Sequence, residues 1–365
     1  MRNCWRSAAS MPACGTASVR PTRPARSFSA RRTMRRRSPI IATLWRDSRC
    51  RGLLSWYERS VCQHGGSMTG WKRQAPFLQA PVRHPHLSSE PIVPGPAAQP
   101  VVSVVMPVHN RILYCAEAID SILSQTLADF EFIIVDDGST DGTSAFLEWY
   151  GGLDARIRLF RNEVNRGVSA SLNHGIAQAR CDLVARMDSD DVALPERLER
   201  QVAFMARHPE LLAAGTALRM IDAGGTLVGP PSKVETDPQA LHSRPSLAHP
   251  TTILRRDAVL RAGGYRSAFD HAEDVDLWFR LGEIGMLGNA PEVLLHYRDH
   301  GGNVHQTHRR RQAFLAEMAA LAAYRRRNGW GDPVEAETRY DEAEMASLLG
   351  WSKDAQTAFL RRMEA

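Results

Sequence analysis

Residues 132–142 read FIIVDDGSTDG, a run of four apolar residues that leads directly into two aspartates and a glycine-containing turn. An apolar run that ends in turn-forming residues is typical of a strand buried on both faces of a parallel sheet. A similar run, residues 101–105, lies about thirty residues earlier, which is the length of a strand–helix–strand unit. We therefore predict an α/β domain that begins near Val101.

The alternation of apolar patterns continues along the chain. Residues 157–159 and 183–185 have the pattern of two further strands, and apolar residues recur at helical spacing between them. Another helix is expected after Pro195, because proline suits the first helical turn. The predicted fold class is α/β, with a mainly parallel sheet flanked by helices. In such sheets ligands bind at the carboxyl ends of the strands.

Charge is distributed unevenly along the 365 residues. Residues 1–100 contain 17 Lys and Arg but only 3 Asp and Glu, whereas the remaining residues contain 29 basic and 37 acidic side chains. The net charge of +6 therefore comes from the first part of the chain. Because the rest is mildly acidic, we expect no nucleic-acid binding by the folded domain.

The six cysteines include no closely spaced pair of the kind that holds zinc. Only Cys115 and Cys181 lie beyond residue 100, and two lone cysteines suit a reducing compartment. No apolar run approaches the roughly 18 residues that a membrane-spanning helix needs. We expect a cytoplasmic protein, with peripheral contact at the inner face of the plasma membrane left open.

Residues 1–100 are predicted to be a disordered leader and linker. The arginine-rich stretch 31–37 lacks apolar periodicity and residues 75–100 are rich in proline, so neither can bury enough surface to offset its ordering entropy. Three interpretations stay open: an organelle transit peptide, a basic arm that binds nucleic acid or anionic lipid, and a translated leader before a true start at Met68. The last interpretation is favoured.

Acidic clusters follow two of the predicted strands. Asp136 and Asp137 follow the second strand, and the sequence Asp188-Ser189-Asp190-Asp191 follows the fourth. Each cluster alone is also explained as a turn or a helix cap. Together at one sheet edge they would repel each other unless a cation or a donor-rich ligand compensated them. Such oxygen ligands suit Mg²⁺ or Mn²⁺, which in turn suit a diphosphate.

The turn after the first strand, residues 107–111, contains no glycine. A dinucleotide-binding fingerprint and a P-loop both need glycines at this point, where the backbone must approach a phosphate closely. Both kinds of site are therefore excluded. A sugar-nucleotide nucleotidyltransferase would also need a phosphate loop rich in glycine and basic residues here, so this class remains only an alternative.

These motifs, in this order, resemble the family 2 glycosyltransferases, inverting enzymes with the GT-A fold. The resemblance extends from Ser103 to His300 and rests on residues 104–110, 134–141, 165–167, 172–173, 187–191, 195–198, 249–251, 263–265, 272–278 and 291–300. It implies a GT-A domain over residues 101–305, followed by a helical C-terminal extension over residues 306–365. It also implies metal-dependent transfer of a sugar from a nucleoside-diphosphate sugar to a hydroxyl acceptor in polysaccharide or lipopolysaccharide synthesis.

The resemblance assigns roles to individual residues. The expected contacts of the nucleotide sugar are Pro107, His109, Asn110, Asp136, Asp137, Arg166, Gly167 and Asp188. The expected ligands of a Mn²⁺ or Mg²⁺ cofactor are Asp188, Asp190 and His300. Asp274 is the expected general base, with Glu273 as the second candidate. Two departures are His109, where the family often has tyrosine, and Cys181, where it often has glycine.

The assignment of Asp274 depends on the other motifs. Leu277 and Leu281 stand at helical spacing, so Asp274 lies in the first turn of a predicted helix, where the helix dipole favours a carboxylate. Acidic residues are common in any first helical turn. Only in company with the two acidic clusters does this position indicate a base that takes a proton from the incoming hydroxyl.

Partners and alternatives complete the expectations. UDP is the favoured donor nucleotide, with thymidine and guanosine nucleotides left open, and the acceptor is a glycan or a lipid-linked acceptor. Residues 309–328 form a predicted amphipathic helix that either rests on an anionic membrane surface or packs on the domain. A catalytically inactive binding protein, with a basic arm for nucleic acid or membranes, is the remaining alternative.

Overall fold

The computed structural model describes residues 99–301, 303, 307–352, 354 and 357. The predicted leader, the alternative start at Met68 and nearly all of the proline-rich linker lie outside the described residues. The predicted division into domains stays a prediction.

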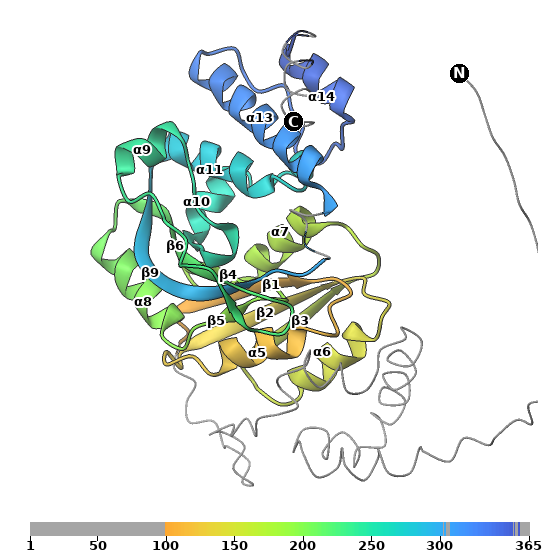
Figure 1. Cartoon of the computed structure of the whole chain (residues 1–365), viewed down its shortest axis with the longest axis vertical. Helices are drawn as coiled ribbons and strands as arrows, with labels where there is room; N and C mark the ends of the chain where they lie inside the picture. The colour runs from red at the N-terminus through yellow and green to blue at the C-terminus, as the bar shows by residue number, and fades with distance from the viewer. Residues whose placement is uncertain (1–98, 302, 304–306, 353, 355–356, 358–365) are drawn as a thin grey trace, which may run out of the picture. The chain divides into compact units, whose positions relative to one another are not determined.

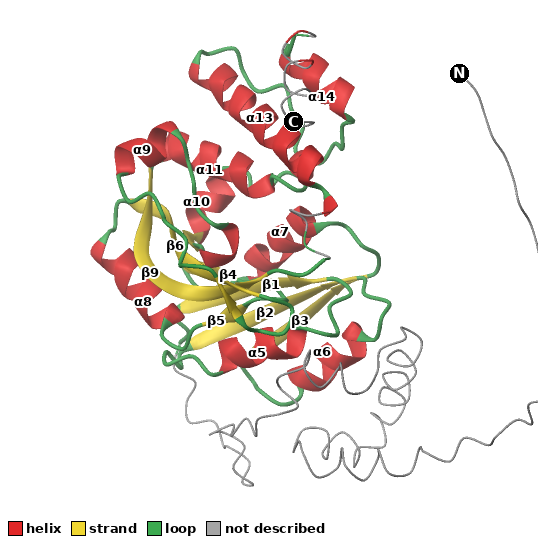
Figure 2. Cartoon of the chain, viewed as in Figure 1, coloured by secondary structure: helices red, strands yellow, loops and turns green. Residues whose placement is uncertain are grey.

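A parallel half-sheet forms the first part of the described chain (Figures 1 and 2). Its strands are β1 (Val102–Val108), β2 (Phe130–Asp137), β3 (Ile157–Asn162) and β4 (Leu183–Arg186), in the spatial order β3-β2-β1-β4. The helices between them are α5 (Cys115–Leu123), α6 (Thr143–Gly151) and α7 (Val168–Gln178). The α/β fold class predicted from the apolar runs is confirmed.

The sheet continues past β4 with mixed pairing, in the order β4-β8-β6-β9-β5 and with β7 beside β6. Strand β8 is antiparallel to β4 and to β6, whereas β6 and β9 are parallel. These strands are β5 (Val192–Ala193), β6 (Leu211–Ile221), β7 (Leu227–Val228), β8 (Ile253–Arg255) and β9 (Met286–Arg298). The helices of this part are α8 (Arg197–Arg207), α9 (Pro238–Ser243), η2 (His249–Thr251), α10 (Arg256–Arg261), η3 (Ser267–Phe269) and α11 (Glu273–Ile284).

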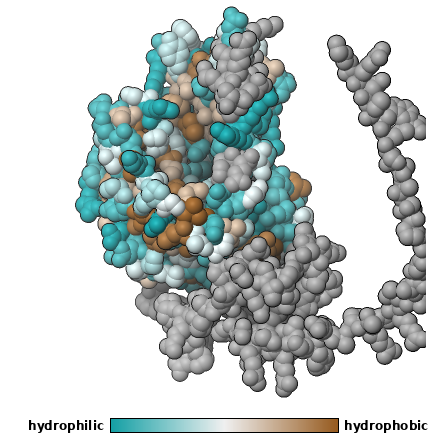
Figure 3. All heavy atoms as spheres, viewed as in Figure 1, coloured by the Kyte–Doolittle hydropathy of each residue, from teal (hydrophilic) through white to brown (hydrophobic). Residues whose placement is uncertain are grey.

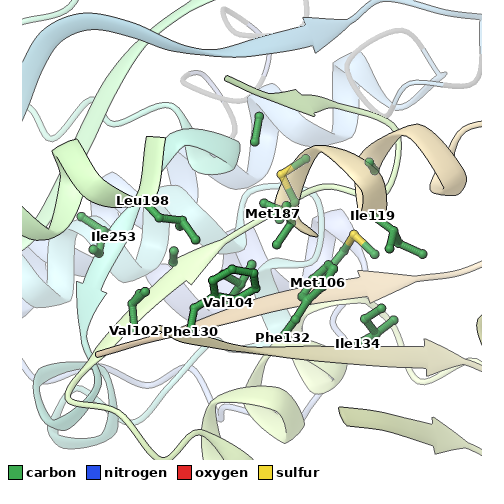
Figure 4. Close-up of a cluster of buried hydrophobic side chains, with 14 of the residues drawn as sticks. Val102, Val104, Met106, Ile119, Phe130, Phe132, Ile134, Met187, Leu198 and Ile253 are labelled. Atoms are coloured by element: carbon green, nitrogen blue, oxygen red, sulfur yellow. The ribbon is translucent and has the colours of Figure 1, made fainter. Parts of the chain in front are cut away.

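Both faces of the parallel half-sheet are covered, which explains its continuous apolar runs. Val104 and Met106 of β1 point into one core with Ile119 of α5, as Figure 4 shows. Val105, between them in sequence, belongs to a second core with Leu172 of α7. Side chains alternate between the two faces of a strand, so a strand buried on both faces cannot alternate in polarity.

Two helices follow β9: α13 (Arg309–Arg327) and α14 (Glu342–Leu349). A third core joins them to α11, with Phe279 of α11 and Phe314 and Met318 of α13 among its members. The apolar face of the predicted amphipathic helix therefore packs against the α/β domain. Among the described residues, no helix combines the length and the apolar character needed to span a bilayer.

On the face shown in Figure 3, apolar side chains gather in a patch bordered by polar ones.

Candidate functional site

Three aspartates meet at the carboxyl end of β4. One carboxylate oxygen from each of Asp188, Asp190 and Asp191 lies within 4.8 Å of the other two. The side chain of Asp190 is 13% exposed, and Asp191 is fully buried. Three carboxylates this close repel one another strongly, because burial removes the water that would screen them.

Three basic side chains contact the cluster. His300 Nε2 donates to Asp190 Oδ2 at 3.0 Å, and Arg111 Nε donates to the same oxygen at 3.3 Å. Arg186 forms an ion pair with Asp188. The carboxylates of Asp188 and Asp190 are thus oriented before any ligand binds.

The burial of Asp191 leaves one polar atom without compensation. Its Oδ1 accepts a hydrogen bond from the backbone N–H of Arg298 at 2.9 Å, whereas its buried Oδ2 has no hydrogen-bond partner among the described residues. A buried polar atom without a partner is costly. A hard divalent cation such as Mg²⁺ or Mn²⁺ fits this set of carboxylate and imidazole donors.

The pKa values of the three carboxyls reflect the competition between burial and charge. Burial raises the pKa of Asp191 well above its ordinary value, and the charges of Asp188 and Asp190 add to the rise. Burial also raises the pKa of Asp188, although the Arg186 charge opposes it. For Asp190 burial again acts upward, but the His300 hydrogen bond and the Arg111 charge outweigh it and lower the pKa.

The end of β9 completes this edge of the site. Arg298 is buried, and its Nε donates to the backbone carbonyl of Asp190 at 2.8 Å. The His300 ring stacks on Tyr114, with a centroid distance of 4.9 Å. His300 contacts Asp190, and Asp188 lies beside Asp190 in the aspartate cluster. Their role as metal ligands stays a prediction, to which the geometry adds Asp191.

Asp136 and Asp137 at the end of β2 organise turns. Asp136 Oδ1 accepts from Ser139 N at 3.0 Å, and its Oδ2 accepts from Ser144 Oγ at 2.5 Å. Asp137 accepts from the backbone N–H groups of Arg166 and Gly167, each at 2.9 Å. Both carboxylates are buried, and through Asp137 the end of β2 holds the loop that precedes α7.

The turn after β1 packs against the turn after β2. His109 Nδ1 donates to the carbonyl of Asp137 at 2.8 Å, so its Nε2 can accept the 3.1 Å hydrogen bond from Asn110 Nδ2. Asn110 adopts a left-handed backbone conformation (φ 51°) and accepts from Thr140 N at 2.8 Å. Pro107 lies in register with Val135 of β2. The residues of this group thus lie at the end of β1, at the end of β2 and in the segments that follow these strands.

A second acidic pair begins α11. Glu273 is buried and Asp274 half-buried. His249 Nδ1 lies 3.6 Å from Glu273 Oε1, and its Nε2 lies 3.0 Å from the Tyr265 hydroxyl. Burial lowers the pKa of His249 well below its ordinary value, so this histidine is neutral and its contact with Glu273 is not an ion pair.

Burial also shifts the two carboxyls of this pair. It raises the pKa of Glu273 to about 8, and the neighbouring Asp274 charge contributes. It raises the pKa of Asp274 as well, against the opposing charge of Arg186. A half-buried carboxyl with a raised pKa at a helix N-terminus is suited to take a proton from a ligand hydroxyl.

Arg186 connects the two acidic groups, and the sequence analysis did not single it out. Its charge acts on Asp188 at the strand end and on Asp274 at the helix start. Arg186 is the last residue of β4 and lies only two residues before Asp188, a closeness that the sequence does show. Arg111 and Arg298 were also missed, because their contacts with the cluster join distant parts of the sequence.

Comparisons with known proteins agree with this arrangement. The family model described as Glycosyl transferase family 2 matches residues 103–260. EpsE of Bacillus subtilis (strain 168) is 37% identical over 204 residues, which cover 55% of this chain and 73% of EpsE. The O-antigen biosynthesis glycosyltransferase WbnJ of Escherichia coli is 37% identical over 207 residues, which cover 55% of this chain and 80% of WbnJ.

A solved structure is similar in fold. S. aureus TarS in complex with UDP superposes with a TM-score of 0.50 at 19% sequence identity, over 68% of this chain and 69% of that chain. TarS has also been solved in complex with UDP-GlcNAc, again with a TM-score of 0.50 to this chain. At this identity the likeness concerns the GT-A-type fold alone.

Proposed function

The chain belongs to glycosyl transferase family 2 and is a glycosyl-transfer enzyme, and we propose that it inverts the anomeric centre of a nucleoside-diphosphate sugar with the help of a divalent cation. The observation that carries the proposal is the carboxylate cluster of Asp188, Asp190 and Asp191, with its unpartnered buried oxygen, at the carboxyl edge of a parallel sheet. The family assignment favours this reading over a nucleotidyltransferase and over an inactive binding protein.

The cation is the part of the proposal that the three aspartates support. Asp188, Asp190 and Asp191 would hold Mg²⁺ or Mn²⁺, together with His300. The bound ion supplies charge neutralisation to the departing diphosphate. Before binding, Arg111 and Arg186 orient two of these carboxylates.

The residues of α11 would perform the proton transfer. Asp274 accepts the proton of the acceptor hydroxyl as the new glycosidic bond forms on the face of the sugar opposite the departing diphosphate. The start of α11 favours the ionised form of Asp274 through its backbone N–H groups. Glu273, whose pKa is raised to about 8, is protonated at neutral pH and limits the negative charge beside the base.

The donor nucleotide is proposed from the comparison with a solved structure. We infer a uridine nucleotide, since TarS, which shares the fold, was solved with UDP and with UDP-GlcNAc. The segments that would hold the nucleoside are residues 107–110, 136–137 and 166–167, which are joined to one another by hydrogen bonds.

The pathway is proposed from the relatives. WbnJ is named for O-antigen biosynthesis, so we propose that this chain also extends a cell-surface glycan, with a glycan or lipid-linked glycan as acceptor. Such an acceptor would place the enzyme on the cytoplasmic side of the membrane, in peripheral contact with it.

The test is turnover of a panel of sugar nucleotides by the full-length protein with Mn²⁺ or Mg²⁺, read as release of nucleoside diphosphate. We expect release from one donor, loss of release with EDTA, and loss of at least about 100-fold in Asp190→Asn, since a metal contributes several kcal/mol to such a step. The exposed Asp237→Asn at the start of α9 is the control. EDTA-insensitive release, or equal rates in the two variants, would refute the metal-dependent reading.

A further inference from the structure

The segment Asp332–Arg339, between α13 and α14, runs alongside the chain that leads into α11. Residues 266–270 contact residues 332–339 in the same order along both stretches. Their hydrogen bonds join Arg266 to Asp332 (2.8 Å) and Val334 (3.3 Å), Ala268 to Ala336 (3.4 Å), and Asp270 to Arg339 (3.2 Å). The C-terminal extension thus touches the approach to Glu273 at alternate positions.

His271, the next residue in the stretch that leads to Glu273, also contacts the C-terminal extension. His271 has a positive φ of 91°, an uncommon conformation for a residue other than glycine. Its ring stacks on His308, directly before α13, with a centroid distance of 4.3 Å and an interplanar angle of 15°. Its backbone N–H donates to Glu273 Oε2 at 2.8 Å. The strained residue therefore lies between the extension and the acidic pair.

Arg339 reaches a second loop at the same time. Its Nη2 donates to the carbonyl of Arg166 at 3.0 Å as well as to Asp270. Gly167, the next residue, has φ +94°, and a Cβ there would lie 2.9 Å from the same Nη2. The Gly167 N–H donates to Asp137 on the predicted donor side. One guanidinium thus joins the donor-side loop to the loop that leads into α11.

We propose that Arg339 is a positioning residue for glycosyl transfer: by bridging Arg166 and Asp270 it sets the base-bearing start of α11 against the donor-side loop. The inference rests on the proposed function and extends it to a segment beyond the matched family region, which ends at residue 260. Arg339 acts through Asp270. The other carboxylate oxygen of Asp270 accepts a hydrogen bond from Ser169 Oγ at 2.6 Å.

Because the side chain of Arg339 is exposed, replacing it tests its role in positioning without unfolding the protein. Its side chain is 61% exposed, and ion pairs this exposed contribute little to stability. Arg310 provides a matched control, because it lies in the same extension, is also 61% exposed and pairs with Glu342 at 3.6 Å, away from both loops. Removing either guanidinium should leave the protein folded, but only Arg339 holds the loops in place.

The test compares Arg339→Gln with Arg310→Gln in the full-length protein. We expect Arg339→Gln to lower kcat about tenfold, since small misplacements of a reacting group cost this much or more. The Kd for UDP with Mn²⁺ should change by less than about threefold, because Asp137 still holds the donor loop. Arg339→Lys, which keeps the positive charge but replaces the guanidinium with an ammonium group, should recover part of kcat. Equal kcat in the two Gln variants overturns the inference.

Two further measurements make the result specific. Asp270→Asn combined with Arg339→Gln should lose no more than the larger single loss, whereas additive losses would contradict action through Asp270. Amide hydrogen exchange over residues 266–274 should be faster in Arg339→Gln than in Arg310→Gln, and unchanged exchange overturns the inference without reference to turnover. A wild-type protein that turns over no donor would refute the proposed function alone, while altered exchange would still support the bridge.

Discussion

Asp274 and Glu273 are adjacent in sequence but differ in surroundings. Asp274 is half-buried at the first turn of α11, whereas Glu273 is buried against His249 and the backbone of His271. Their pKa values are both raised, chiefly by burial. Two neighbouring carboxyls that face different environments can take different roles, one ionised and one protonated.

The first prediction concerns Asp274 as the base. Asp274→Asn should lower kcat by about 100- to 10,000-fold, the usual contribution of a general base. Because burial raises the pKa of Asp274 above its ordinary value of 3.8, wild-type kcat/KM should fall as the pH is lowered through that raised pKa. The residual activity of the variant should lack this acid limb. A variant with wild-type kcat, or with the same acid limb, would rule Asp274 out.

The second prediction concerns Glu273 and stability. Its pKa is raised to about 8 from an ordinary 4.5, so the unfolded chain releases this proton first as the pH rises. The free energy of unfolding should therefore decrease between about pH 4.5 and pH 8 through this group. In Glu273→Gln, urea unfolding at pH 5 and pH 8 should show a smaller decrease than in wild type. Glu337→Gln, at an exposed position, should keep the wild-type decrease, and identical slopes in all three proteins would contradict the raised pKa.

At the scale of elements, the turn after β2 determines where the donor-side loop lies. Gly138 has φ +68°, and a Cβ there would meet the backbone of Val164 and Asn165 at 2.7–2.8 Å. Two turns therefore approach each other closely, directly beside the loop that Asp137 holds. Only glycine satisfies both the conformation and the contact.

The third prediction separates these two requirements. Gly229 has a similar φ of +66°, but a Cβ there would meet nothing within 4 Å. Gly229→Ala should therefore cost only the conformational strain, whereas Gly138→Ala should cost a further 1–3 kcal/mol or so for the overpacked contact. Urea denaturation of the two variants measures the difference. Equal destabilisation would mean that the turn moves freely, contrary to the close approach described.

The pairing of elements also shows where sequence patterns stop being informative. The strands β1 and β2 each contain a run of apolar residues buried on both faces, so their sequence alone predicted them. Strand β9 contains Gly288 and Pro291, and its pairing with β6 has several register shifts. Such a strand has no regular period, and its partners are set by packing between distant segments.

In the described part of the molecule, the acidic residues of the candidate site could be predicted from the sequence, whereas the arginines that contact them could not. Asp188, Asp190 and Asp274 follow recognisable local patterns. Arg298 reaches its contact with the cluster only through β9, more than a hundred residues after β4 in sequence. The bridge made by Arg339 likewise depends on how the extension packs against α11, which no local pattern specifies.

We infer that the aspartate cluster binds a cation that in turn helps to bind a nucleoside diphosphate. Calorimetric titration of UDP into the full-length protein, with Mn²⁺ and with EDTA, tests it without an acceptor. We expect Mn²⁺ to tighten UDP binding by at least about tenfold in the wild type and to have little effect in Asp190→Asn. Equal affinity with Mn²⁺ and with EDTA, or the same Mn²⁺ effect in Asp190→Asn as in the wild type, would contradict it.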